Sequence, residues 1–260
     1  MRIILSVISL LCFLYFISCK PDNSLYKADL LNEEASRLMN AGRISEAIPL
    51  YHQAIGFTSV PDSNKSIYYS NIANAYNGIG NFDSAKFFLK KVIEVSPKGS
   101  CEYYTNYARI FLIDSLPEKA INSLEKAYHL NQDYMLANNI LGLIYTGSYG
   151  MEFYDPQKAL PYNSKTLELT GDNNAKFVLA KNYYYLEMVE KSVALFKEMY
   201  KDYPDNIDYL STIIMMEQEL GNKNDVDFYL EKMKALSPET YEGLINDPVE
   251  AGVHNLTWEE

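Results

Sequence analysis

Few residues in this 260-residue sequence have the types and spacing that catalysis needs. Carboxylates come in close pairs, at Glu33 and Glu34 and again at Glu217 and Glu219, and such pairs can serve as general acid and base. Both pairs lie in segments with helical patterns, where we expect them to face solvent. Cys101 has no base nearby in the sequence, so we expect it to pack as a small apolar residue or to lie near a helix start.

Motifs that hold phosphates, nucleophiles or metals are absent from the sequence. There is no Gly-x-Ser-x-Gly turn, no phosphate-binding loop and no metalloprotease His-Glu pair. The glycines of "NGIG" at 77–80 do not have the spacing of a dinucleotide-binding turn and indicate the end of a helix. The cysteines are few and the three histidines are far apart, so we predict no metal, no cofactor and no enzymatic activity.

Composition and charge narrow the class of protein. The chain is 48% apolar and 22% charged, which is sufficient for a packed core. Its formal net charge of −11 does not suit the phosphate backbone of a nucleic acid. We therefore predict no nucleic-acid partner.

The N-terminus has the pattern of a secretory signal. Met1 and Arg2 precede an uncharged apolar run from Ile3 to Ile17, which is short for a membrane span. We predict a signal peptide over residues 1–18.

The residues that end this run, Phe16-Ile17-Ser18-Cys19, are similar to the bacterial lipobox, although Phe16 stands where that motif usually has Leu. The resemblance implies that Cys19 is lipidated and that residues 19–27 form a tether, which would place the protein at a membrane of the bacterial cell envelope. An ordinary cleaved signal with an incidental cysteine and an uncleaved anchor are the alternatives.

Small residues recur through the body of the chain at 38, 35, 39, 33 and 34-residue intervals. They begin successive helical patterns and are Ala47, Ala85, Ala120, Ala159, Ser192 and Val226. Aromatic, leucine and proline positions follow in phase, as in the second unit, where they are Tyr69, Ile72, Ala73, Tyr76, Phe82, Leu89, Val92 and Pro97.

This pattern resembles the tetratricopeptide repeat, a helix-turn-helix unit of about 34 residues. The resemblance implies an all-α, right-handed superhelical solenoid of about six repeats within residues 28–240, followed by a C-terminal cap and tail at 241–260. The predicted repeats are 28–61, 66–99, 101–134, 135–172, 173–206 and 207–240. Gly42, Gly80 and Gly221 fall at one repeat position, where a left-handed residue ends a helix.

The fourth repeat departs from the pattern. Its small residue Ala159 comes five residues late, and Asn163 and Thr166 replace larger apolar residues. The extra residues fall in 146–157, where we expect a longer loop or helix extension whose aromatic residues fold back onto the array; a loop that grips a ligand is the alternative. After Pro238 we expect a short capping helix, and a tail that contains the only tryptophan, Trp258.

The first helix of each repeat lines the concave surface of such an array. Carrying the family geometry over, the residues that we expect to contact a protein or peptide partner are Asn74, Asn77, Arg109, Asn139, Leu143, Phe177, Lys181 and Tyr184. Amides suit an extended backbone and apolar residues suit side chains, although some of these residues could instead pack along the inner wall. The cations of the family's clamp for acidic chaperone tails are missing here, which disfavours that ligand.

These observations predict a lipid-anchored scaffold that binds another envelope protein through an extended peptide or a partner helix. One alternative is an envelope protein that captures a solute or glycan with the loop 146–157. A weaker alternative is an accessory sensor for a separate membrane regulator.

Overall fold

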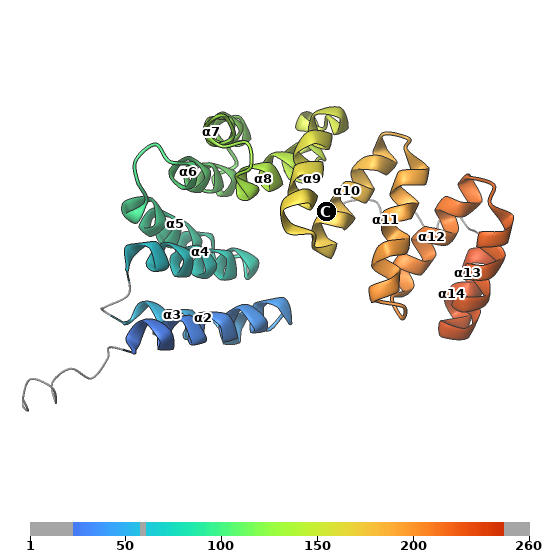
Figure 1. Cartoon of the computed structure of the whole chain (residues 1–260), viewed down its shortest axis with the longest axis horizontal. Helices are drawn as coiled ribbons and strands as arrows, with labels where there is room; N and C mark the ends of the chain where they lie inside the picture. Colours follow the sequence, from blue (N-terminus) through green and yellow to red (C-terminus); the bar gives the residue numbers. More distant parts are fainter. Residues whose placement is uncertain (1–22, 58–60, 247–260) are drawn as a thin grey trace, which may run out of the picture. The chain divides into compact units, whose positions relative to one another are not determined.

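The computed structural model describes residues 23–57 and 61–246, and in this part of the chain every regular element is a helix (Figure 1). The α-helices are α2 (Ser24–Asn40), α3 (Ile44–Ile55), α4 (Asp62–Gly78), α5 (Phe82–Val95), α6 (Cys101–Ile113), α7 (Pro117–Leu130), α8 (Met135–Tyr145), α9 (Pro156–Thr170), α10 (Asn173–Tyr185), α11 (Val189–Asp202), α12 (Ile207–Glu219), α13 (Lys223–Leu236) and α14 (Pro238–Asn246), with a 3₁₀ turn η1 at Met151–Phe153. The predicted all-α class is confirmed. The predicted signal peptide, Cys19 and Trp258 lie outside the described residues.

The chain forms two compact units, Met1–Leu116 and Pro117–Glu260. Within each unit, helices pack mainly against their neighbours in sequence: α2 to α6 in the first and α7 to α14 in the second. Such nearest-neighbour packing is the organisation of a repeat array. The division falls between α6 and α7, inside the third predicted repeat (101–134).

The recurring small residues lie buried in their helices. Ala47, Ala85, Ala120, Ala159 and Ser192 are each 0% exposed. Ser192 Oγ satisfies its polar group by donating to the carbonyl of Ala180 across the hairpin, at 2.8 Å. Val226, in the last hairpin, is half-buried. A small side chain at this position lets the two helices of a hairpin approach closely.

The turn within each hairpin has a residue in the left-handed region. Gly42, Gly80 and Gly221 have φ angles of 72°, 73° and 71°, as predicted from their spacing. Ser115 and Glu187 hold the same repeat position with φ of 54° and 58°, although neither is a glycine. The next backbone N–H bonds to a carbonyl five residues back in all five turns, at 2.8–2.9 Å, so the turn geometry is shared while the residue type is not.

The fourth repeat has its own packing. A Cβ added to Gly142 in α8 would lie 1.9 Å from Oδ1 of Asn163 in α9, so only glycine admits this asparagine. Asn163 Nδ2 in turn donates to Asn182 Oδ1 of α10 at 3.0 Å in a buried bond. A polar residue therefore replaces an apolar one here because it has both space and a partner.

The N-terminal boundary of the helical array was predicted less accurately than the C-terminal capping helix. Helix α2 already begins at Ser24, and Ala28 in its second turn is 0% exposed, so the predicted tether of 19–27 is too long by four residues at its C-terminal end. The predicted cap is present as α14, whose Leu244 is 0% exposed and packs with Leu210 and Met233. Within residues 23–57 and 61–246, no helix combines the length and apolar character that crossing a bilayer requires.

Candidate partner-binding faces

The first helices of successive repeats are joined by polar side chains in the first compact unit. Three of these bonds run from α4 to α2 or α6: Asn71 Nδ2 donates to Asn32 Oδ1 at 2.8 Å, Tyr68 donates to Asp29 at 2.5 Å, and Ser66 donates to Glu102. The partners are 36 or 39 residues apart, which is one repeat. We call this set, together with the contacts of Arg109, the polar ladder.

Arg109 in α6 is the centre of the polar ladder. Its Nη1 donates to Ser70 Oγ and to Asn106 Oδ1, each at 3.0 Å, and its Nη2 donates to Asn74 Oδ1. Arg109 is half-buried, whereas Asn74 and, one turn later, Asn77 are exposed. The guanidinium is therefore held in place before any partner binds, and free amide capacity lies next to it on α4.

The corresponding helix of the fifth repeat presents a different chemistry. Lys181 in α10 is only 2% exposed, and its Nζ lies 5.5 Å from the ring centroid of Phe177. Burial lowers the pKa of Lys181 to about 8. Lys181 therefore packs within the array, which was the alternative left open by the sequence, and its contact with a partner stays a prediction. Its four-carbon stem is part of the packing, as burial of a lysine requires.

Phe177 and Tyr184 of α10 are half-buried. Both pack against the apolar core of the fifth and sixth repeats, and the ring of Phe177 meets that of Phe196 edge-to-face at 5.8 Å. Burial, with the nearby Glu219 carboxylate, raises the pKa of Tyr184. These two residues therefore contribute partly to the inner wall, which was the alternative left open by the sequence.

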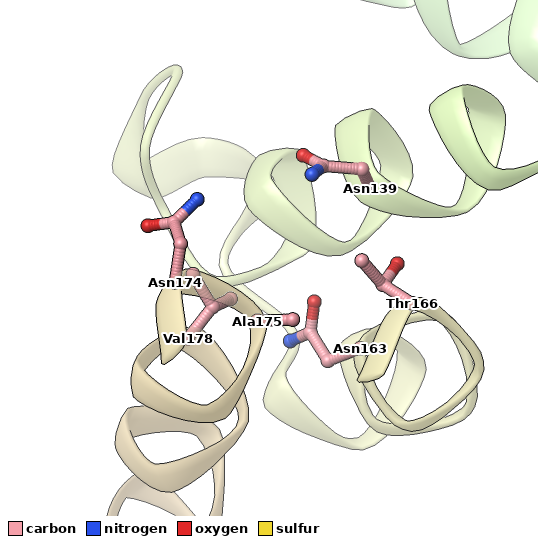
Figure 2. A pocket seen from close by; sticks show the side chains of 6 residues that line it. All are labelled: Asn139, Asn163, Thr166, Asn174, Ala175 and Val178. Atoms are coloured by element: carbon pink, nitrogen blue, oxygen red, sulfur yellow. The ribbon is translucent and has the colours of Figure 1, made fainter. Parts of the chain in front are cut away.

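Asn139 and Leu143 in α8 are both half-buried. Asn139 lines a small pocket with residues of α9 and α10 (Figure 2). No residue of the loop 146–157 lines this pocket. The eight predicted contact residues thus stay a prediction, with Asn74 and Asn77 the most accessible and Lys181 the least.

The loop 146–157 is partly anchored. Tyr154 packs edge-to-face on Tyr185 of α10 at 5.7 Å, and Asp155 caps α9 by accepting from the N–H of Lys158. Tyr149 and Met151, in contrast, are 41% and 68% exposed. The predicted fold-back is therefore seen at Tyr154, while Met151 is largely exposed.

Glu217 is a buried charge that was missed in the sequence. It is 1% exposed, contrary to the expectation that it faces solvent. Lys197 Nζ lies 2.6 Å from its Oε1, and Asn222 Nδ2 donates to its Oε2 at 2.6 Å. Burial lowers the pKa of Lys197, but hydrogen bonds to Asp225 and Glu217 outweigh this and raise it overall. These groups join α11, α12 and α13, and their ionic pairing accounts for them without catalysis.

Cys101 is half-buried in the first turn of α6, after the N-cap Ser100, whose hydroxyl accepts from the N–H of Tyr103 at 3.1 Å. Among the described residues no three His, Cys, Asp or Glu side chains gather as a metal site would require.

Helices paired into hairpins by left-handed turns, with each hairpin stacked on its neighbours, define a helical-repeat fold. Residues 67–98 match the tetratricopeptide repeat family. Small glutamine-rich tetratricopeptide repeat-containing protein 2 of Mycosarcoma maydis is 27% identical over 110 residues, which are 42% of this chain and 30% of that relative. This chain thus matches less than a third of the relative's length.

Solved structures of repeat proteins are similar over most of the chain. YrrB, described as having an unusual peptide-binding site, has a TM-score of 0.51 at 18% identity and covers 78% of this chain and 96% of its own. PilF of Pseudomonas aeruginosa has a TM-score of 0.57 at 14% identity, with 87% and 100% covered. The Cut9–Hcn1 hetero-tetramer has a TM-score of 0.60 at 15% identity, with 86% and 43% covered. Residues 67–98 thus match the tetratricopeptide repeat, and the described chain shares its fold with solved proteins built of such repeats.

Proposed function

We propose that this protein is a lipid-anchored scaffold of the bacterial cell envelope that binds another envelope protein along the first helices of its repeats. Tetratricopeptide repeats suggest protein–protein interaction, and the relative YrrB is described as binding a peptide. The observation that carries the proposal is the polar ladder. It holds Arg109 in a fixed position beside the exposed amides of Asn74 and Asn77.

The polar ladder suits an extended backbone. An asparagine amide has both donors and acceptors, so it can pair with the N–H and C=O of a peptide. Because Arg109 is already bonded to Ser70 and Asn106, ordering it costs little on binding. In the second unit, half-buried Leu143, Phe177 and Tyr184 supply apolar contact for side chains.

The partner is identified by crosslinking in cells. A photoreactive residue at position 77 or 143, followed by mass spectrometry, is expected to capture one protein reproducibly. A photoreactive residue in place of Asp83, whose side chain is 100% exposed on α5, is the matched control on a second helix of a hairpin. Equal capture from position 83 would contradict the assignment of the face.

Removing the amides tests the chemistry of this face. Asn74→Ala with Asn77→Ala is expected to weaken capture about tenfold, since each lost hydrogen bond is worth about 0.5–1.5 kcal/mol. Both side chains are exposed, so the fold should be retained, and a thermal melt checks this. Undiminished capture by this double variant would exclude the polar ladder as the binding surface.

The lipid anchor rests on Cys19, by its likeness to a lipobox. Several acyl chains would hold the protein firmly, because each buried methylene contributes about 0.8 kcal/mol. Metabolic labelling with a fatty acid is expected to mark the wild type and not Cys19→Ser. A wild-type protein that is never labelled would remove the anchor while leaving the partner-binding face untouched.

A further inference from the structure

Exposed apolar side chains of the second unit gather at the connections between its repeats. The second helices α7, α9 and α11 each end within one residue of such a side chain, at Leu130, Leu169 and Tyr203, which are 57%, 40% and 53% exposed. The first helices α8 and α12 begin at two more, Met135 and Ile207. These five are half of the ten large apolar side chains that are exposed among the described residues of this unit. Their recurrence at equivalent positions of successive repeats marks an interaction surface.

Two side-chain contacts bring these connections together. Lys165 Nζ of α9 lies 3.2 Å from Asp133 Oδ1 in the α7–α8 connection. Asn173 Nδ2, at the start of α10, donates to Asp202 Oδ2 at the end of α11, at 3.4 Å. Lys165 and Leu169 are four residues apart in α9 and so share a face. The segments 130–135, 165–173 and 201–208 therefore lie next to one another, and we call them the loop edge.

The loop edge carries negative charge beside its apolar side chains. It holds six carboxylates and two lysines, which gives a formal charge of −4. The carboxylates are Asp133, Glu168, Asp172, Asp202, Asp205 and Asp208, and the lysines are Lys165 and Lys201. Lys165 is already paired with Glu168, at 2.8 Å, as well as with Asp133. The C-terminal ends of α7, α9 and α11 add the partial negative charge of helix ends. The edge therefore complements a surface that is both apolar and cationic.

These features are confined to the loop edge. On the first helices α10 and α12 of the same unit, Lys181, Ser211 and Met215 are buried, which leaves little apolar area for a partner there. The α5–α6 connection of the first unit, residues 96–100, has no carboxylate. Its exposed residues are Pro97 and Lys98. The combination of exposed apolar and acidic side chains is thus a property of three successive connections in the second unit.

We propose that the loop edge docks a cationic amphipathic helix of another protein. The apolar face of that helix packs on Leu130, Leu169 and Tyr203, and its lysine or arginine side chains lie against the carboxylates of the edge. This surface is separate from the polar ladder, so the inference goes beyond the proposed function and does not depend on the lipid anchor.

The backbone of the edge favours a helix over an extended segment. An extended segment needs a row of backbone partners, such as the edge of a sheet provides. The loop edge consists of helix ends and turns, and its own side chains already cap two helix starts. Asp172 accepts from the N–H of Ala175 at 2.7 Å, and Asn206 accepts from the N–H of Tyr209 at 2.9 Å. A helix satisfies its own backbone and brings only side chains to such a surface.

The charge of the edge disfavours other occupants. Anionic lipid headgroups and nucleic-acid phosphates would be repelled. A second copy of the chain would bring the same acidic edge and a net charge of −11. The C-terminal residues 247–260 hold four carboxylates and no lysine or arginine. The cations must therefore come from a different protein.

The test is a fluorescence anisotropy titration of the full chain against dye-labelled peptides of about 18 residues, or five helical turns. The probe has leucine along one helical face and lysine and alanine elsewhere. Three comparison peptides replace each lysine by glutamate, scramble the leucine positions at the same composition, or carry two prolines in the middle. We expect saturable binding of the probe with a Kd on the order of 10–100 μM in about 0.15 M salt, and at least tenfold weaker binding of the other three.

Replacing apolar side chains localises the contact. Leu169→Asn with Tyr203→Asn should weaken binding of the probe about tenfold or more, because two exposed apolar contacts are lost. Phe87→Asn is the control, since this residue of α5 is 54% exposed but lies in the first unit. It should bind as the wild type does. All three side chains are exposed, and thermal melts check that the variants fold.

Neutralising carboxylates tests the charge. Glu168→Gln with Asp205→Asn should weaken binding about threefold to tenfold, and more at lower salt. The control is Asp83→Asn with Glu94→Gln, which changes the net charge equally. Glu94 also pairs with a lysine three residues earlier, as Glu168 does. Equal weakening by both double variants would overturn the loop edge, because binding would then follow net charge alone.

The peptides decide the nature of the occupant. Equal binding of the lysine and glutamate peptides, or of the helical and proline peptides, would overturn the proposed helix. A lipid surface would replace it if vesicles with phosphatidylserine bound the wild type and not Leu169→Asn with Tyr203→Asn. Asn74→Ala with Asn77→Ala should bind the probe as the wild type does. Loss of crosslinking from position 77 with probe binding intact would refute the polar ladder alone, and the reverse result would refute the loop edge alone.

Discussion

Arg109 and Lys181 occupy the ninth position of the third and fifth predicted repeats, yet their surroundings are opposite. Arg109 is half-buried and bonds to side chains of α4 and α6, so its charge is spread over hydrogen bonds. Lys181 is 2% exposed over the ring of Phe177, and burial lowers its pKa to about 8. The same repeat position therefore places both cations on the first helix of a repeat. The side chains around each cation determine whether it is hydrogen-bonded, as Arg109 is, or buried with a lowered pKa, as Lys181 is.

The difference extends along the first helices of the two compact units. In the first unit, polar partners one repeat apart pair with each other, as Asn71 does with Asn32. In the second, α12 contributes an almost continuous buried stretch from Leu210 to Glu217, and its one charge in that stretch is paired with Lys197. The first helices of the first unit are thus joined by polar pairs, whereas α12 of the second unit is buried mainly through apolar side chains.

The largest expected difference between the two cations comes from charge reversal. Lys181→Glu places an anion in a buried site over an aromatic ring and should lower the free energy of unfolding by at least about 3 kcal/mol. Arg109→Glu should cost about 1–2 kcal/mol, because Asn74 and Ser70 can turn to water. Urea unfolding of both variants measures this. Equal losses would mean that the two sites are equally buried.

Features of the fold that depend on residues close together in the sequence could be predicted, whereas features that depend on contacts between helices could not. The small residues and Gly42, Gly80 and Gly221 were found because hairpin packing and turns are local and repeat along the chain. Ser115 and Glu187 share the turn without the residue type that signals it. The burial of residues such as Lys181 depends on side chains from other helices, which no spacing along one helix reports.

The fourth repeat shows the same limit. Asn163 departed from the apolar pattern and was recognised as a departure, but its cause lies in two other helices. Gly142 leaves it space and Asn182 binds its amide. The contact between Gly142 in α8 and Asn163 in α9 can be recognised only once the two helices are folded into a hairpin. The pocket that results was therefore absent from the sequence-based prediction.

Glycine substitution compares this packing with that of the first unit. Gly142→Ala should lower the free energy of unfolding by about 2–3 kcal/mol, because its Cβ would overlap the buried Asn163 and break the bond to Asn182. Gly78→Ala in α4 meets only the flexible end of Ile44, at 3.1 Å, and should be neutral or slightly stabilising. Thermal melts of the two variants test this, and similar losses would contradict the special packing of Gly142.

The pH dependence of stability isolates Lys181. Its pKa is about 8 in the folded chain and 10.5 as the reference, so above pH 8 the unfolded state binds more protons. Stability should therefore rise with pH, by about 2 kcal/mol between pH 8 and 9.5. Below about pH 7 both states are protonated and the contribution is constant.

Lys181→Met removes the titrating group and retains much of the packing, so its stability should lack this rise. The difference between the two curves cancels the contributions of the tyrosines, including Tyr68 and Tyr185, whose pKa values are raised to about 12, mainly by burial. Arg109→Met should leave the pH dependence unchanged over the same interval, because arginine keeps its proton. Parallel curves for wild type and Lys181→Met would show that Lys181 is solvated.

The smallest expected change in stability comes from the left-handed turn that both units share. Ser115→Gly in the first unit and Glu187→Gly in the second relieve a left-handed backbone, and each should raise the free energy of unfolding by about 0.5–1 kcal/mol. The reciprocal control Gly80→Ser should lower it by a similar amount, because it places a side chain at φ of 73°. Equal gains at positions 115 and 187 would show that the repeats share one backbone while their faces differ. A gain at only one position would mean that the turns after α6 and α10 differ in strain. Part of the difference between Arg109 and Lys181 would then come from the turns that follow their helices.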